Sequence, residues 1–164
     1  MKCLIELICF HVNQLMNPRV RVSGLSKVIN LVGQILTKRI ISESKRAEVF
    51  LFMPFKNYPS SYVSDSALLI FEQLENSVCS HNFPLSMVKN LINENYILKI
   101  TVYDNHVGVF DSLAPMDLLL FYNLHIKEDR FYNGFYQYIL HGGNDFGRRC
   151  VPIDKNGVIG KIFF

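Results

Sequence analysis

The segment YILKITVY, residues 96–103, constrains the fold of this 164-residue chain more than any other stretch. Alternate residues fall into two sets, Ile97, Lys99, Thr101 and Tyr103 on one side and Tyr96, Leu98, Ile100 and Val102 on the other. A period of two in β-branched and aromatic residues is typical of a strand with one buried face. The chain must therefore provide further strands to pair with this one.

Four other segments are predicted to be strands. Residues 107–110 follow the turn Asp104-Asn105-His106 and would pair with 96–103 as a hairpin. The apolar run 49–53 is of strand length, and residues 150–153 and 158–164 flank the hairpin signal Asn156-Gly157.

Apolar residues at steps of three and four predict helices elsewhere. The predicted helices cover residues 3–16, 25–40, 68–78, 85–92, 115–122 and 128–140. Helices and strands do not alternate strictly, which disfavours a doubly wound parallel sheet. We therefore expect a single α+β domain over residues 1–164, with a mainly antiparallel sheet packed against several helices.

Composition and charge narrow the choice of partner. Hydrophobic residues make up 49% of the chain and the formal net charge is only +3, without a long basic run. Nucleic acid is therefore unlikely as a partner on this argument, although Arg19, Arg21, Lys38 and Arg39 could contact an anion. The abundant apolar residues favour an interaction surface for another protein or for self-association.

The N-terminal segment MKCLIELICFHVNQLM indicates a core helix, because it contains a glutamate and is too short to span a bilayer. Without a secretory leader, the four cysteines are expected to be reduced thiols in a cytoplasmic protein. The Cys-x-His pairs at 9–11 and 79–81 lack the spacing of a zinc site, so we expect no metal. No cofactor motif occurs either.

Two short segments resemble cysteine peptidases. The segment HVGVF, beginning at His106, resembles the histidine strand of the cell-wall peptidase family of papain-like enzymes, with Cys79 as the upstream candidate nucleophile. The fragments VFDSL and GGNDFG resemble those of SUMO-protease-like peptidases, which implies Asp111 as the orienting acid. Phe146 stands where that second family has its cysteine, so the resemblance implies a degenerate, inactive relative.

The loop HGGNDFGRRC, residues 141–150, holds the densest group of reactive side chains. The candidate catalytic residues are His106, Asp111, His141, Asp145 and Cys150. A hydrolase or transferase would pair Cys150 or Cys79 with one of these histidines. Because no catalytic set is complete, we expect a non-enzymatic protein-binding or regulatory domain first, a small cysteine-dependent enzyme second, and an anion- or nucleic-acid-binding domain third.

Overall fold

A computed structural model describes residues 27–53, 58–64, 67, 85–143 and 145–154 of the chain. Six strands lie in this part, and they are β1 (Lys27–Ile41), β2 (Arg46–Phe52), β3 (Ile97–Tyr103), β4 (Leu118–Glu128), β5 (Tyr136–Leu140) and β6 (Arg149–Pro152). One α-helix is described, α3 (Leu85–Asn93), together with the 3-10 segments η1 (Ser42–Ser44), η2 (Asp104–Ser112) and η3 (Asp145–Gly147).

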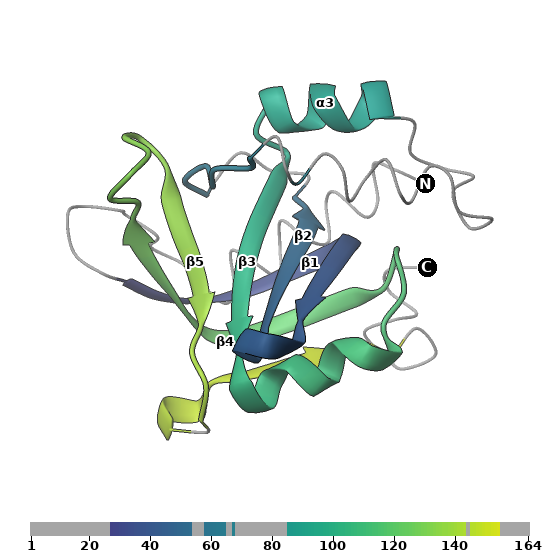
Figure 1. Ribbon diagram of the computed structural model, residues 1–164, viewed down its shortest axis with the longest axis vertical. Helices are drawn as coiled ribbons and strands as arrows, with labels where there is room; N and C mark the ends of the chain where they lie inside the picture. Colours follow the sequence, from purple (N-terminus) through teal and green to yellow (C-terminus); the bar gives the residue numbers. More distant parts are fainter. Residues whose placement is uncertain (1–26, 54–57, 65–66, 68–84, 144, 155–164) are drawn as a thin grey trace.

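The first five strands close into a barrel (Figure 1). Their order is β1-β2-β3-β5-β4, and an antiparallel pairing of β1 with β4 joins the two ends of the sheet. All neighbours are antiparallel except β3 and β5, which run parallel. The short strand β6 extends the edge of β4 that β5 leaves open.

The inside of the barrel is an apolar core. Its fully buried side chains come from all five barrel strands and include Leu31, Ile35, Val49, Leu51, Ile100, Val102, Leu119, Phe121, Leu124 and Leu140. At one end η2 closes this core, because its Phe110 is fully buried. Lys38 fixes the C-terminal end of η2 by donating hydrogen bonds to the carbonyl oxygens of Phe110 and, at 2.6 Å, Leu113.

Helix α3 covers part of the outside of the barrel, at the end opposite to η2 (Figure 1). Its Val88 packs against Phe50 of β2, Ile97 of β3 and Leu36 of β1 in a second, smaller apolar cluster. The remainder of the outer face of β2 and β3 is not covered by this helix.

The expected α+β fold with several helices is therefore wrong. The segments predicted as helices at 25–40, 115–122 and 128–140 overlap β1, β4 and β5. In β1, residues 31–37 are buried without interruption, so the period of two that marks a half-buried strand is absent. Register shifts after Ile29 and Ile35 also displace the pattern, which leaves apolar steps of three and four.

Several individual elements are confirmed. The predicted strands at 49–53, 96–103 and 150–153 correspond to β2, β3 and β6, and the predicted helix at 85–92 is α3. The predicted hairpin partner at 107–110 is wrong, because these residues belong to η2. The predictions for 3–16, 68–78 and 158–164 lie outside the described residues, and the single-domain organisation of residues 1–164 stays a prediction.

Candidate nucleic-acid interface

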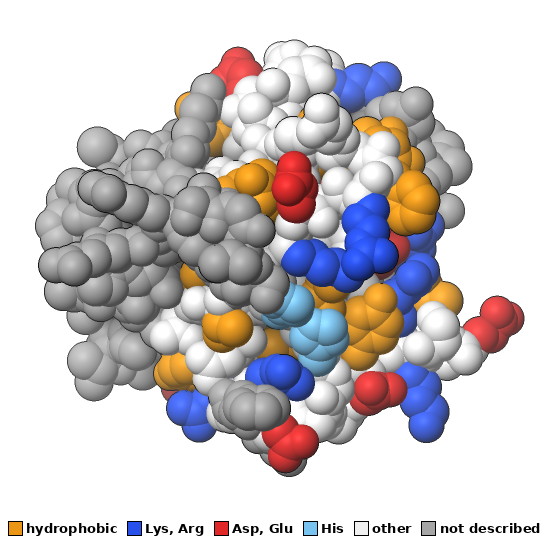
Figure 2. Space-filling model, turned by 90° about the vertical axis from the view of Figure 1, so that its left-hand side faces the viewer, with side chains coloured by type: hydrophobic (Ala, Val, Ile, Leu, Met, Phe, Trp, Pro, Cys, Tyr) orange, Lys and Arg blue, Asp and Glu red, His pale blue; other side chains and the backbone are white. Residues whose placement is uncertain are grey.

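Polar and basic side chains gather on the outer face of the barrel strands. Figure 2 shows Lys and Arg side chains beside histidines on the side of the molecule where β5 lies in Figure 1. This face consists of the outward side chains of β2, β3, β5 and β4, and these strands are neighbours in that order. The candidate interface is built from this face.

The outer face of β2 and β3 changes from apolar to polar along its length. At the α3 end, Phe52 is paired with Ile97; toward the other end, the next outward pairs are Phe50 with Lys99, Glu48 with Thr101 and Arg46 with Tyr103. The apolar members support α3, whereas the polar members face away from the core. The strand register thus places a charged and aromatic surface next to a rigid, helix-covered one.

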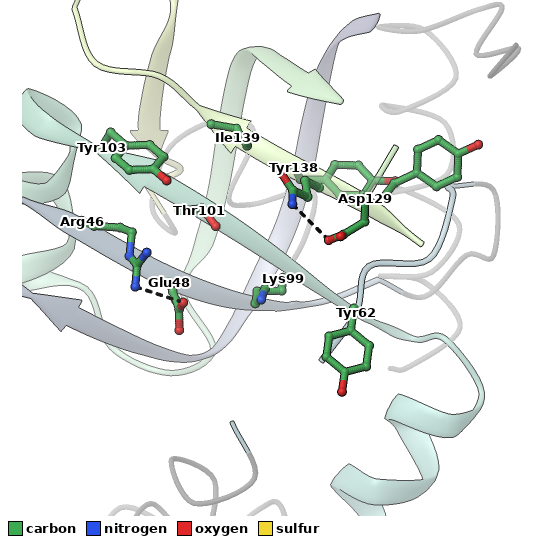
Figure 3. Close-up of a pocket in the computed structure, with 11 residues that line it drawn as sticks. Arg46, Glu48, Tyr62, Lys99, Thr101, Tyr103, Asp129, Tyr138 and Ile139 are labelled. Atoms are coloured by element: carbon green, nitrogen blue, oxygen red, sulfur yellow. Dashed lines mark hydrogen bonds and ion pairs between the residues drawn. The ribbon is translucent and has the colours of Figure 1, made fainter. Parts of the chain in front are cut away.

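A groove of about 190 Å³ lies over this polar part (Figure 3). It is lined by Arg46, Glu48, Tyr62, Lys99, Thr101, Tyr103, Asp129, Tyr136, Gln137, Tyr138 and Ile139. Four of these are tyrosines and two are basic, and all but Tyr62 and Asp129 belong to strands β2, β3 and β5. The lining also includes the acidic Glu48 and Asp129, and Tyr138 is buried in the core, so the groove offers aromatic rings and charges of both signs on paired strands.

The segment 58–64 lies between β3 and β5 at one end of the groove. The backbone N–H of Tyr136 donates to the carbonyl of Ser60 at 2.8 Å, and the N–H of Lys99 donates to Ser61 Oγ at 2.7 Å. The hydroxyl of Tyr138 donates to the carbonyl of Pro59 at 2.6 Å. These bonds satisfy strand groups where β3 and β5 no longer pair, and they hold Tyr62 at the groove.

The β4–β5 loop, residues 129–135, adds aromatic rings beside the groove. Tyr132 stacks on Tyr62 with a centroid distance of 3.6 Å, and Phe135 meets Tyr62 edge-on at 5.6 Å. Phe131 in the same loop is 85% exposed. An exposed phenylalanine next to stacked tyrosines is available for stacking on a planar ligand.

Asp129 fixes the start of this loop. Its Oδ1 accepts hydrogen bonds from the N–H groups of Phe131 (2.9 Å) and Tyr132 (3.3 Å), and its Oδ2 accepts from Gln137 Nε2 at 3.1 Å. Burial alone would raise the pKa of Asp129, but the hydrogen bonds from Phe131, Gln137 and Tyr132, with the charge of Lys99, lower it. This carboxylate therefore stays ionised and orders the aromatic loop.

The basic groups differ in how they are paired. Glu48, which is largely buried, forms an ion pair with Arg39 and lies 3.7 Å from Arg46. Lys99 lines the groove from the centre of β3. The cationic contribution of the groove thus comes from Lys99 and from two arginines that share one carboxylate.

A closed barrel with strand order β1-β2-β3-β5-β4 and a groove over β2 and β3 defines the OB-fold-like class. In this class, strands β2 and β3 with the adjoining loops are the surface that binds oligonucleotides and oligosaccharides. A positively charged groove with aromatic rings is the arrangement by which such barrels hold single strands.

The family model described as the ssDNA-binding domain of telomere protection protein matches residues 71–157, which is more than half of the chain. The chain belongs to this family. No curated protein matches it.

Two solved structures share the fold. The Schizosaccharomyces pombe Pot1pC structure bound to ssDNA has 14% identity and a TM-score of 0.53, over 88% of this chain and 91% of that one. A structure of fission yeast Pot1 and ssDNA has 12% identity and a TM-score of 0.52, over 86% of this chain. The match spans only 40% of that second chain.

These findings correct the expected function and partner. The prediction of a protein-binding domain and the alternative of a cysteine-dependent enzyme are wrong, because the family is one of ssDNA-binding domains. The judgement that nucleic acid is an unlikely partner is wrong for the same reason. It relied on the low net charge and on the lack of a long basic run, and neither detects a few cations that folding brings together on one face.

The structure separates the residues proposed for catalysis. Cys150 lies buried in β6, where burial raises the pKa of its thiol far above the usual range. His106 is buried in η2, with Nε2 3.0 Å from the carbonyl oxygen of Gly143, while Asp111 and Asp145 are exposed. His141 instead contacts His125, with 2.9 Å between Nε2 and Nδ1.

The residues proposed for anion binding differ in their positions and partners. Arg39 lies at the edge of the groove through its ion pair with Glu48, whereas Lys38 is committed to the carbonyls at the end of η2. Arg19 and Arg21 lie outside the described residues. Sequence reasoning missed Lys99, Tyr103 and the loop aromatics, although the alternation in 96–103 already placed Lys99 and Tyr103 on one face.

Two further observations concern the described part of the chain only. None of its helices is long and apolar enough to cross a membrane. Its His, Cys, Asp and Glu side chains form no group of three or more that could hold a metal ion.

Proposed function

We propose that this chain binds single-stranded DNA along the groove over β2, β3 and β5. The observation that carries the proposal is the groove itself, with Lys99 and Arg46 beside Tyr103 and the loop aromatics, in a chain of this family. Lysine and arginine neutralise phosphates, and exposed rings stack on unpaired bases, which a duplex keeps stacked inside.

Each part of the groove has a separate task in this proposal. Lys99, at the centre of β3, contacts a phosphate and holds the backbone of the strand against the sheet. Tyr103, and Phe131 in the loop at the other end of the groove, stack on separate bases of the strand. Stacking of this kind contributes about 1–3 kcal/mol per base and tolerates any base.

The family description also supports a specific cellular role, at chromosome ends. A domain of this family would act on single-stranded DNA at chromosome ends, and we therefore place the protein in the nucleus. The expectation of a cytoplasmic protein followed from the lack of a recognisable secretory leader and from reduced thiols, and a nuclear protein shares that redox environment.

Fluorescence anisotropy with a labelled single strand and its matched duplex tests the proposal. We expect the single strand to bind more tightly, with affinity falling steeply as salt rises. Lys99→Ala should weaken binding and reduce the salt slope by about one, and Tyr103→Ala should weaken it by about 1–3 kcal/mol. Lys89→Ala, an exposed lysine on α3, is the matched control and should change neither quantity.

Equal losses in the Lys99 and Lys89 variants would show that binding is non-specific and does not use the groove. Equal affinity for the single strand and the duplex would overturn the stacking role of the tyrosines and phenylalanine.

A further inference from the structure

A pair of histidines lies one strand beyond the groove. His125 of β4 and His141, which follows β5, approach to 2.9 Å between Nδ1 and Nε2, and their ring centroids are 5.1 Å apart. His125 is the register partner of Ile139, and Ile139 is the partner of Thr101 on its other side. Ile139 and Thr101 both line the groove, so the histidine pair continues the same outer face.

The charged groups around the pair are mostly positive. Lys127 of β4 and Arg148, just after η3, act on both rings. On the acidic side, Asp104 of η2 lies against Gly142, which follows His141, and Asp145 belongs to η3. Among the groove residues, Tyr103 of β3 is the titratable group on this side. Figure 2 shows surface histidines with Lys and Arg side chains nearby.

The charges around the histidine pair favour an anion over a metal cation as ligand. Two ring nitrogens are too few for a tetrahedral metal site, and Lys127 and Arg148 would repel a cation. An anion gains from both cations and from ring N–H donors. Phosphate groups of a nucleic-acid strand crossing the groove are anions of this kind.

Protonation would change the pair in a defined way. Burial, then the neighbouring cations and, for His141, the other histidine, lower the pKa values of both rings, so the pair is neutral at neutral pH. In the neutral pair one ring donates the shared hydrogen bond and the other accepts it. Uptake of one proton adds a full positive charge at the end of the groove.

We infer that His125 and His141 form a phosphate subsite that extends the groove, and that single-stranded DNA is bound there with uptake of a proton. This inference depends on the proposed function, because the phosphate belongs to the strand held in the groove. It adds a site outside the groove and a regulation of binding by pH.

The direction of the pH effect follows from linkage. A phosphate beside the pair favours its charged form and raises the pKa of the bound histidines above that of the free protein. Affinity must then increase as the pH falls through the pKa of the complex, and it levels off below that of the free protein. One proton taken up gives at most about a tenfold gain per pH unit.

The experiment measures binding of a thymidine oligonucleotide of about 12 nucleotides, a length within the usual site size of such barrels. Thymine is chosen because it takes up no proton in this pH range. Affinity is compared at about pH 7.5 and about pH 5.5, on either side of the ordinary histidine pKa. The variants are His125→Gln and His141→Gln, and Lys99→Ala is the control.

We expect wild-type protein to bind several-fold more tightly at the lower pH and both glutamine variants to lose most of that gain. Lys99→Ala should bind weakly at both pH values but keep the ratio between them. NMR titration of the two histidines, free and bound, should show higher pKa values in the complex. This readout is independent of any loss of stability in the variants.

An undiminished gain in both glutamine variants, or histidine pKa values that are the same in the free and bound protein, would refute the phosphate subsite and leave the proposed function intact. Absence of binding by the wild-type protein at both pH values would overturn the proposed function and the subsite together.

Discussion

Lys38 provides a direct test of which cations serve the fold and which serve the ligand. Its ammonium group donates to the carbonyl oxygens of Phe110 and Leu113, which lie at the end of the segment that closes the barrel. Burial lowers its pKa, although Asp111 and Asp117 act in the opposite direction. Replacement by methionine keeps an unbranched side chain that lacks only the terminal ammonium group, and it removes both hydrogen bonds.

The expected effect of Lys38→Met can be estimated from these two bonds. A hydrogen bond to a charged group contributes about 1.5–3 kcal/mol, but Lys38 is only partly buried and water can replace part of each bond. A loss of about 2 kcal/mol for the pair is therefore expected. In a chain of this size this lowers Tm by about 4–8 °C.

Urea unfolding and thermal melts measure this loss, and anisotropy below the melting range measures binding of a single strand. The free energy of unfolding should fall in Lys38→Met while the salt slope of binding stays unchanged. Lys99→Ala should give the reverse, with stability within about 0.5 kcal/mol of wild type. A Lys38→Met protein of wild-type stability and reduced salt slope would refute this assignment.

Three further predictions concern single side chains. Glu48→Gln should tighten binding of a single strand and steepen its salt dependence, because Arg39 and Arg46 lose their shared carboxylate; weaker binding would mean that Glu48 positions them. Cys150 should be alkylated, as followed by peptide mass spectrometry, only after unfolding, because burial raises the pKa of its thiol; equal rates in native and denatured protein would contradict its burial. Phe131→Ala should lose about 1–3 kcal/mol of binding with little change in stability, and an unchanged affinity would exclude stacking on this ring.

Secondary structure is predicted best from the sequence where only one face of a segment is buried. In β3 the core covers one face and leaves Lys99, Thr101 and Tyr103 outside, so the alternation is plain. In β1 the core lies on one face and α3 with its cluster on the other, and Leu36 is buried on the outside as fully as Ile35 is inside. A segment buried on both faces has no periodicity that distinguishes a strand from a helix.

The site could be predicted only in part, because the strand register brings together residues that are far apart in the sequence. One row of register partners crosses all five strands of the barrel, and it consists of Arg39, Glu48, Thr101, Ile139 and His125. Alternation assigns Thr101 to a face but cannot name its neighbours, because these are fixed by pairings between distant segments. The parallel pairing of β3 with β5, in particular, joins residues 38 positions apart, such as Thr101 and Ile139.

The position of the groove follows from the partial cover that α3 provides. Outward side chains near α3 must be apolar to pack against Val88, whereas those farther along β2 and β3 lie beyond the helix and can carry charge, as Arg46 does, and as Glu48 does through its ion pair with Arg39. The change between Phe50 and Glu48 marks where the helix stops covering the sheet. A ligand that docks beside α3 meets strands whose inner face packs on the barrel core and whose edges are paired, and charged groups therefore reach it without reorganisation of the sheet.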